Sequence, residues 1–268
     1  MSNLTSNISC AVFVSSCDPY ADLWRPFFTL LFRYWDDCPY PIYLGSDKLS
    51  FDHPPVKVLY YDHGTNWTNK IKEQISTINA EYIILFLEDF FLQDKINQKD
   101  IDYCLEFLHQ HNGHCVRMIR WPAPNKKIQG EKLIGEITTE TPYRISTQDA
   151  IWRKSSLLNL MKADESIWQF EIDGSKRSDQ LYPEGFYGTW KDVMTYKHHV
   201  VERGKWFPWE AKKFGKMNIG CDFTKRAIMS KREATKWRKA KFMASVFRLI
   251  PLPIRKKMGK SFAELPNI

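Results

Sequence analysis

Short apolar runs alternate with segments of helical periodicity through the first hundred residues. The runs with the length and flanking residues of strands are 10–15, 41–45, 56–61 and 81–87. Segments 21–34 and 66–78 carry apolar residues three or four apart, which predicts helices. The run EYIILFL at 81–87 is apolar on both faces, as expected of a central parallel strand. This alternation predicts an α/β fold.

The second half of the chain has a less regular pattern. It predicts a helix at 100–111, a strand at 115–121, extended segments within 131–147, a helix at 152–161 and a late strand at 193–201. Residues 166–188 are rich in aromatic and charged side chains and are expected to be irregular. The fold class we expect is therefore a central, mostly parallel sheet flanked by helices.

Positive charge is concentrated at the C-terminal end. The 268 residues have a net charge of +8, yet residues 225–268 hold 13 Lys and Arg against two acids, while residues 1–224 hold 26 against 29. A basic body that grips nucleic acid is therefore not expected, and we predict no nucleic-acid partner. A content of 43% hydrophobic and 15% aromatic residues excludes a disordered or collagen-like chain.

The sequence also indicates a compartment. No apolar run approaches the roughly 20 residues that span a bilayer, and no basic residue precedes the first short apolar run. Six single cysteines have no Cys-x-x-Cys spacing, which is typical of buried thiols in a reducing cytosol. We therefore expect a cytoplasmic protein.

Two adjacent acids, Glu88 and Asp89, follow the central strand. In an open α/β sheet, ligands lie outside the carboxyl ends of the strands. Acids at that position can bind a divalent cation whose shell is completed by phosphates. A solvated strand end that happens to be acidic is the alternative. The segment SSCDPY at 15–20 lies at the end of the first strand, where a nucleotide commonly binds in such folds.

Several stretches in this order resemble nucleotide-sugar-dependent glycosyltransferases of the GT-A fold, and more closely bacterial enzymes that build capsule, O-antigen or lipopolysaccharide chains. The stretches are YADLW (20–24), WDDCPY (35–40), YIILFLED (82–89), YRISTQDAIW (143–152) and ESIWQFE (165–171). The family's usual metal motif is Asp-x-Asp, whereas this chain has Leu87, Glu88 and Asp89.

The resemblance implies a donor site that binds Mn²⁺ or Mg²⁺. Asp89 matches the metal-binding carboxylate, with Glu88 assisting and His198 as a late ligand; a core or surface histidine is the alternative for His198. The other donor-binding residues implied are Ser15, Asp18, Tyr20 and Arg144. For Arg144 a surface salt bridge is the alternative.

The resemblance also implies a catalytic base on the acceptor side. Glu171 fits best, because flanking aromatics could desolvate it and raise its pKa. The rival carboxylates are Asp149, Glu165 and Asp173, and an exposed loop acid is the alternative for Glu171. The aromatic side chains expected to stack on an acceptor sugar, unless they belong to the core, are Tyr143, Trp152 and Trp168.

The basic C-terminal segment predicts a domain of residues 1–222 followed by a tail of residues 223–268. In the tail, an apolar stripe is expected from Ile228, Trp237, Phe242, Val246 and Leu249. A basic helix with aromatic residues on one face is typical of attachment to an anionic membrane surface. A helix packed on the domain and an RNA-binding segment are the alternatives.

Together these patterns predict an inverting glycosyltransferase at the inner face of the cell membrane, with a nucleotide-sugar donor and a lipid-linked or other saccharide acceptor. One alternative is a non-catalytic nucleotide-binding or scaffold subunit of a polysaccharide assembly complex. A nucleotidyltransferase or phosphotransferase is the other, because it would also use acids at the end of a strand.

Overall fold

The computed structural model describes the backbone of residues 8–64 and 66–249, and side chains as far as residue 240. Contacts divide the chain into two compact units, Met1–His199 and Val200–Ile268. The predicted boundary after residue 222 stays a prediction, and this division groups residues 200–222 with the helix that follows them. The two units are described separately below.

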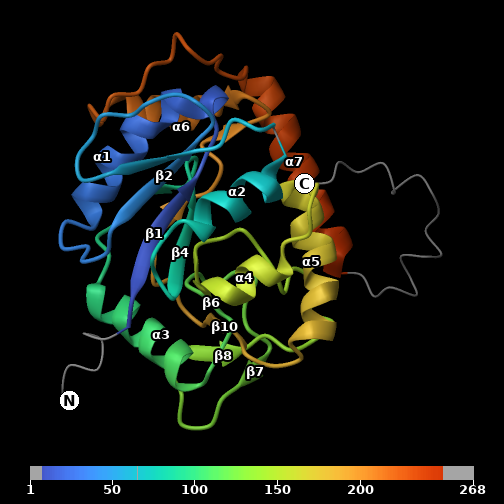
Figure 1. Ribbon diagram of the computed structural model, residues 1–268. Helices are drawn as coiled ribbons and strands as arrows, with labels where there is room; N and C mark the ends of the chain where they lie inside the picture. Colours follow the sequence, from blue (N-terminus) through green and yellow to red (C-terminus); the bar gives the residue numbers. More distant parts are fainter. Residues whose placement is uncertain (1–7, 65, 250–268) are drawn as a thin grey trace. The chain divides into compact units, whose positions relative to one another are not determined.

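The first unit is built on one sheet with the strand order β3-β2-β1-β4-β9-β6-β10-β8-β7 (Figure 1). The strands are β1 (Cys10–Ser15), β2 (Ile42–Ser46), β3 (Lys57–Tyr60), β4 (Tyr82–Leu87), β6 (Cys115–Arg117), β7 (Lys126–Lys127), β8 (Ile134–Glu136), β9 (Ala150–Arg153) and β10 (Phe186–Thr189). Only β9 and β8 run against the others. The predicted α/β class with a mostly parallel sheet is confirmed.

The centre of the sheet follows from the apolar runs. β1 is buried at every position, and β4 at every position except its last, because helices cover both faces of the sheet. The two strands pair in parallel from Cys10 opposite Tyr82 to Ser15 opposite Leu87. This register brings the ends of both strands to the same edge.

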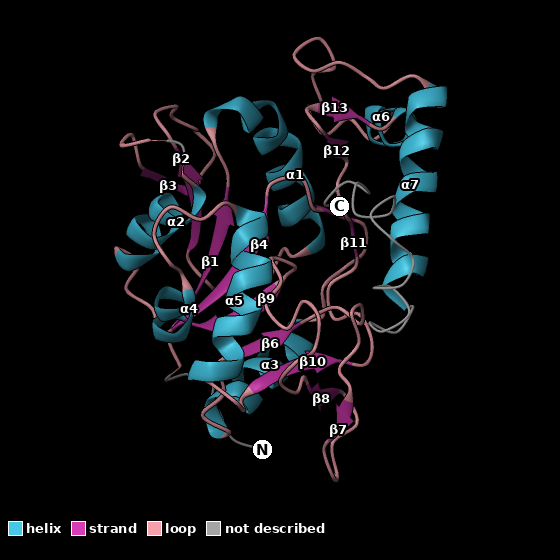
Figure 2. Cartoon of the chain, turned by 90° about the vertical axis from the view of Figure 1, so that its right-hand side faces the viewer, coloured by secondary structure: helices cyan, strands magenta, loops and turns pink. Residues whose placement is uncertain are grey.

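Five α-helices and a 3₁₀ turn flank this sheet. They are η2 (Asp18–Leu23), α1 (Trp24–Tyr34), α2 (Trp67–Ser76), α3 (Gln98–Gln110), α4 (Lys154–Leu160) and α5 (Ile167–Leu181). Figure 2 shows α2, α4 and α5 together, and their apolar side chains pack in one cluster with Phe13, Leu85 and Trp152 of the sheet. On the other face, Phe27 of α1 packs edge-on against Phe86 of β4, with ring centroids 5.9 Å apart.

The structure corrects two local predictions. Residues 166–188, expected to be irregular, contain the 15-residue helix α5 and the strand β10. Trp152, expected in a helix, belongs to β9, and the helix α4 begins only at Lys154. The late strand is two short pieces, β11 (Tyr196–Lys197) and β12 (Val201–Glu202).

The second unit contains the hairpin of β12 and β13 (Lys205–Trp206), helix α6 (Pro208–Gly215) and helix α7 (Lys231–Leu249). Phe207, Met229 and Ala234 form its small core, with Trp209 and Trp237 packed against it. Arg238 lies 5.0 Å from the centre of the Trp209 ring. The basic helical C-terminal extension is therefore present as α7.

The predicted apolar stripe does not form as expected. Ile228 lies before α7 and makes an isolated bridge to Trp206. Positions 237 and 242 of one helix are separated by about 140° around its axis, so they do not share a face. The side chains of Phe242, Val246 and Leu249 lie outside the described residues. Within the described part of the chain, no helix is long and apolar enough to cross a membrane.

Charge separates at the division between the two units. Residues 200–268 hold 18 Lys and Arg against five acids, a net charge of +13. Residues 1–199 hold 21 against 26, a net charge of −5. The excess of positive charge therefore extends over the whole second unit. It includes residues 200–222, which precede the tail of residues 223–268 predicted from the sequence.

Candidate functional site

The candidate site lies along the edge where the parallel strands end. β1, β4 and β6 finish there at Ser15, Leu87 and Arg117. β9 runs the opposite way and pairs Ala150 with both Leu85 and Arg117, so the chain enters β9 at this same edge. Asp149, immediately before β9, is thereby brought near enough to Asp89 for the two carboxyl groups to interact. We call this region the carboxyl edge.

Asp18 fixes the loop that follows β2. Its carboxylate accepts hydrogen bonds from the Ser46 hydroxyl (2.9 Å) and from the backbone N–H groups of Asp47, Lys48 and Leu49 (3.0–3.3 Å). Burial alone would raise the pKa of Asp18, but these bonds outweigh it and lower the pKa. The geometry thus gives this predicted donor residue a supporting role.

A buried lysine joins the two loops at the ends of β1 and β2. Lys70 of α2 is 4% exposed, and its ammonium donates to the Ser16 carbonyl (2.8 Å) and to the Asp47 carboxylate (2.9 Å). Beside it, the Trp67 indole donates to the Ser15 hydroxyl (3.1 Å). The end of β1 is therefore held rigidly.

Tyr20, another predicted donor residue, lies partly buried in η2. Its backbone N–H donates to the Cys17 carbonyl at 2.9 Å.

Glu88 and Asp89 are the two central residues of a turn in which the Phe90 N–H donates to the Leu87 carbonyl (3.2 Å). The chain then forms β5 (Phe91–Leu92), which pairs with β11. This pairing brings the residues after β11 back to the turn, where His199 Nδ1 lies 3.4 Å from Asp89 Oδ2. Both acids are 8% exposed.

The histidine beside Asp89 is therefore His199, whereas the sequence favoured His198 as a metal ligand. His198 packs between Tyr196 and Phe90, with ring centroids 4.4 and 5.5 Å away. Burial, and then the neighbouring His199, lower the pKa of His198 to about 4, so it is neutral at pH 7. His199 has a φ of 50°, which turns the chain at this point.

Asp149 is the most unusual group at the carboxyl edge. It is fully buried, and neither carboxylate oxygen has a hydrogen-bond partner. Burial, and then the negative charge of Asp89, raise the pKa of Asp149 well above its usual range. A buried carboxyl without partners is costly when ionised, so Asp149 favours its protonated form.

The short segment before β9 reaches both sides of the candidate site. On one side, the Tyr196 hydroxyl donates to the Gln148 side chain (2.8 Å) and accepts from the Asp149 N–H (3.4 Å). On the other side, Thr147 donates to Glu171 Oε1 from its backbone N–H (2.7 Å) and its hydroxyl (2.8 Å). Residues 147–149 thus connect the surroundings of Asp89 with those of Glu171.

Glu171 lies in α5 near a buried arginine. Arg117 is 3% exposed, its Nη1 donates to the Tyr143 carbonyl at 3.4 Å, and its Nη2 has no partner. Burial lowers the pKa of Arg117, and the nearby Glu171 carboxylate opposes that shift. Arg117 and Glu171 therefore lie close enough to interact electrostatically.

The stacking of Trp168 and Tyr143 on an acceptor sugar stays a prediction. Trp168 is 60% exposed and precedes Glu171 by three residues in α5, so the two side chains are neighbours on the helix surface. Tyr143 is half-buried and has a φ of 56°.

Trp152, Arg144 and Glu165 do not join this group. Trp152 is fully buried in the core, so its ring has no face open to a sugar, and that prediction is corrected. The Arg144 guanidinium is buried and donates to Ser178 Oγ and to the carbonyls of Ile137, Tyr182 and Pro183, which gives it a structural explanation.

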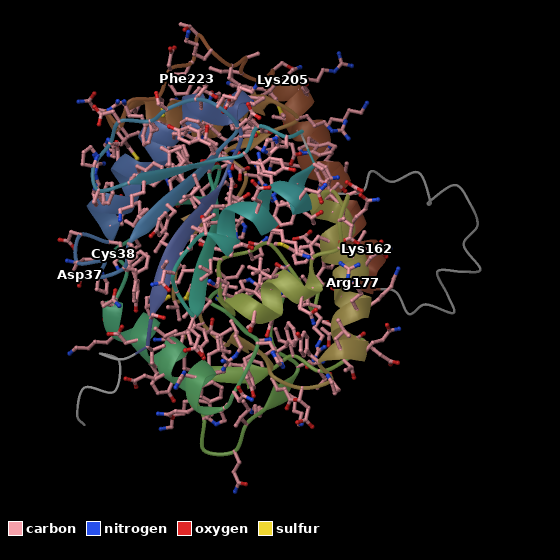
Figure 3. The ribbon with its side chains drawn as sticks, viewed as in Figure 1. Asp37, Cys38, Lys162, Arg177, Lys205 and Phe223 are labelled. Carbon is pink, nitrogen blue, oxygen red and sulfur yellow. The ribbon has the colours of Figure 1, made fainter. Side chains whose placement is uncertain are left out.

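The Glu165 carboxylate is 10% exposed and makes two 2.6 Å bonds to the Arg177 guanidinium. Figure 3 labels Arg177 on α5. This ion pair ties the residues before α5 to the helix. Asp173, the other rival base, is half-buried and pairs with Lys176 at 2.7 Å.

The carboxyl edge offers some of the ligand atoms that a divalent cation needs, but not a complete set. Asp89 and His199 offer an oxygen and a nitrogen close together, and the buried oxygens of Asp149 lack partners. Among the residues that the structure describes, however, no three His, Cys, Asp or Glu side chains are grouped to hold a metal ion. A cation would therefore need further oxygens from a phosphate ligand and water, as Mg²⁺ commonly does.

Sequence reasoning missed several residues of this site. Tyr196 and Arg117 were assigned to strands without a role, and Lys70 was one lysine among many on a helix. Their importance comes from burial and from partners far away in the sequence. Of these residues, only His199 could be suspected from the sequence, because it is adjacent to His198.

No family model matches the sequence, and no curated protein matches it. Among solved structures, the chain is similar to TarS from S. aureus. The crystal structure of TarS 1-349 aligns over 70% of this chain and 59% of that chain, with 12% identity and a TM-score of 0.44. A second crystal structure of TarS aligns over 61% of this chain and 33% of that chain, with 12% identity and a TM-score of 0.40. The function proposed below therefore rests on this chain's own residues.

Proposed function

We propose that the carboxyl edge is the active site of a GT-A-like glycosyltransferase, which moves a sugar from a nucleotide-diphosphate donor to a saccharide hydroxyl. One observation supports this most: the loop 147–149 joins the acidic surroundings of Asp89 to a carboxylate, Glu171, that lies beside an exposed tryptophan. The acids around Asp89 would serve the donor diphosphate, and Glu171 with the tryptophan would serve the acceptor.

The donor is assigned to the ends of β1 and β4. Lys70 and Asp18 hold the loops after β1 and β2, and so shape a surface for the nucleoside. The diphosphate would lie at Asp89 and His199. A bound Mn²⁺ or Mg²⁺, held by Asp89 and His199 and completed by phosphate oxygens, would neutralise the leaving group.

The acceptor is assigned to the α5 side, with Glu171 as general base. Glu171 takes the proton of the acceptor hydroxyl while that oxygen bonds to the anomeric carbon. The bond from the anomeric carbon to the phosphate oxygen breaks, and the nucleoside diphosphate leaves with the electron pair. A single displacement of this kind inverts the anomeric configuration. Trp168 would support the acceptor ring.

The second unit is assigned to an anionic membrane surface. Its net charge of +13 is typical of proteins that attach to an anionic membrane surface. This fits a lipid-linked acceptor at the inner face of a bacterial membrane, in the synthesis of capsule, O-antigen or lipopolysaccharide.

A non-catalytic nucleotide-binding or scaffold subunit is the second candidate. The observation that favours it is the lack of a three-residue metal group among the described side chains, together with Leu87 in place of an acid. A nucleotidyltransferase or phosphotransferase would differ in its products, since it releases pyrophosphate or a phosphosugar.

The test is a screen of UDP, GDP, CMP and dTDP sugars with Mn²⁺ or Mg²⁺. We expect one donor to bind and to release its free nucleotide, with a saccharide as the second product. Asp89→Asn should abolish that release without lowering the melting temperature. Binding without turnover would favour the scaffold, and no binding at millimolar concentration would refute both.

A further inference from the structure

Two neighbouring cavities run along α3. One has a volume of about 540 Å³ and is lined by Asp100 and Tyr103 of α3 and by residues 130–133 and 190–191. The other, of about 290 Å³, continues along α3 past Glu106 and Gln110. Both share Tyr103, Gly130 and Glu131, so together they form one groove, which we call the α3 groove. The larger cavity alone is within the usual size range of ligand sites.

The walls of the α3 groove are held in place. The Tyr103 hydroxyl donates to one oxygen of Glu131. The other oxygen of Glu131 accepts from the backbone N–H groups of Leu133 (2.7 Å) and Ile134 (3.1 Å). This chain of bonds ties the loop before β8 to α3.

Trp190 is positioned by a glycine in β8. A Cβ atom on Gly135 would come within 2.6 Å of the Trp190 ring, so only glycine allows the indole to lie against this strand. The indole is thereby fixed where it also lines the larger cavity.

The chemistry of the α3 groove fits a saccharide chain. Tyr103 and Trp190 supply aromatic surface, and Tyr103 is 43% exposed. Carboxylates and an amide, on Asp100, Glu106 and Gln110, can bond to hydroxyl groups. The acids Asp100, Glu106 and Glu131 outnumber Lys132 and Lys191 in the lining, so the groove has no surplus of positive charge for an anionic polymer.

The groove also reaches the carboxyl edge. Trp190 follows β10, which ends at Thr189 at that edge. Two residues further on, Asp192 accepts from the Arg120 N–H (2.8 Å), and its charge acts on the pKa of His198 and of Tyr196. A chain lying in the α3 groove is therefore directed towards the carboxyl edge, on the side of Tyr196 and His198.

We propose that the α3 groove binds the saccharide chain of the acceptor, several sugar units away from its reacting hydroxyl. This rests on the proposed function for the identity of the chain. A glycosyltransferase that holds its acceptor in this way binds a longer oligosaccharide more tightly than a short one.

Binding to an array of neutral bacterial surface oligosaccharides, one to six sugar units long, tests the proposal. We expect affinity to rise with chain length, and Tyr103→Ala to weaken hexasaccharide binding about tenfold, while Tyr103→Phe, which keeps the ring, weakens it less. Tyr60→Ala is the matched control, because Tyr60 is a 53% exposed tyrosine on β3, outside the groove.

A second variant guards against misfolding. Lys132 is exposed and lines the larger cavity, so Lys132→Trp should fill the groove and weaken hexasaccharide binding while the fold is kept. Affinity that does not rise with length, or binding unchanged in both Tyr103→Ala and Lys132→Trp, would overturn the proposal.

A parallel thermal-shift measurement with nucleotide sugars separates this proposal from the proposed function. Hexasaccharide binding that depends on Tyr103, with no nucleotide-sugar binding, would refute the function and support the groove. Nucleotide-sugar turnover without Tyr103-dependent binding of the hexasaccharide would refute the groove alone.

Discussion

Replacing Asp149 by Asn should change how the free energy of unfolding of the first unit depends on pH. Asp149 is fully buried, its oxygens have no partners, and its pKa is raised well above the model-peptide value of 3.8. Between the unfolded and folded pKa values, the folded protein keeps a proton that the unfolded chain has released. The contribution of protonated Asp149 to the free energy of unfolding is therefore complete below pH 3.8. It is lost progressively as the pH rises from there to the folded pKa of Asp149.

The size of this effect follows from proton linkage. One extra bound proton in the folded state costs about 1.4 kcal/mol of unfolding free energy for each pH unit. Asp149→Asn cannot ionise, so between pH 3.8 and the raised folded pKa of Asp149 its free energy of unfolding should gain about that amount per pH unit relative to the wild type. Any free-energy cost of burying the Asn amide does not depend on pH. It shifts the difference in unfolding free energy between Asp149→Asn and the wild type by a constant and leaves the slope of that difference against pH unchanged.

Urea denaturation followed by tryptophan fluorescence, at pH 4.5, 5.5 and 6.5 with a chelator present, measures this slope. Asp52→Asn is the control, because the Asp52 side chain is exposed to water in the folded protein. A difference between Asp149→Asn and the wild type that stays constant with pH would refute our description of the Asp149 environment.

Three further predictions concern the ion pair before α5, the acceptor surface and the second unit. Glu165→Gln should lower the free energy of unfolding by about 3 kcal/mol, because it removes the carboxylate charge that pairs with Arg177; equal stability in urea would contradict this. Trp168→Ala should raise the KM for the acceptor about tenfold and leave the KM for the donor unchanged, and the reverse pattern in steady-state kinetics would argue against Trp168 as an acceptor surface. Replacing Lys231, Arg232 and Lys236 together by Glu should abolish co-sedimentation with anionic vesicles at low salt; unchanged sedimentation would exclude α7 as the contact.

The sequence was sufficient where the signal is local. The apolar run before Glu88 and Asp89 predicts both the central strand and the place of these acids, because a run buried on both faces has one position in an α/β sheet. The basic helix near the C-terminus is also recognisable from composition. The fold class followed from these features.

Helix α5 was missed because its buried face is made of small residues. Phe170, Gly174, Ser175 and Ser178 face the core, and three of them add nothing to a hydrophobic period. The usable signal was the capping box: the Ser166 side chain accepts from the Gln169 N–H and the Gln169 side chain reaches back.

The composition of the site could not be predicted because its contacts are non-local. Asp149 meets Asp89 only because β9 inserts antiparallel between β4 and β6. Glu165 looked like a candidate base until Arg177, twelve residues later, was found to bind it. The sequence alone left Trp152 among the acceptor residues, because its complete burial is visible only in the folded structure.

The central claim is that Glu171 deprotonates an acceptor at a nucleotide-sugar site. Release of free nucleotide from the donor that binds best, measured with acceptor present for the wild type and for Glu171→Gln, tests it most directly. We predict that Glu171→Gln binds the donor normally and releases nucleotide about 10²- to 10⁴-fold more slowly. Release at the wild-type rate by Glu171→Gln would contradict the account.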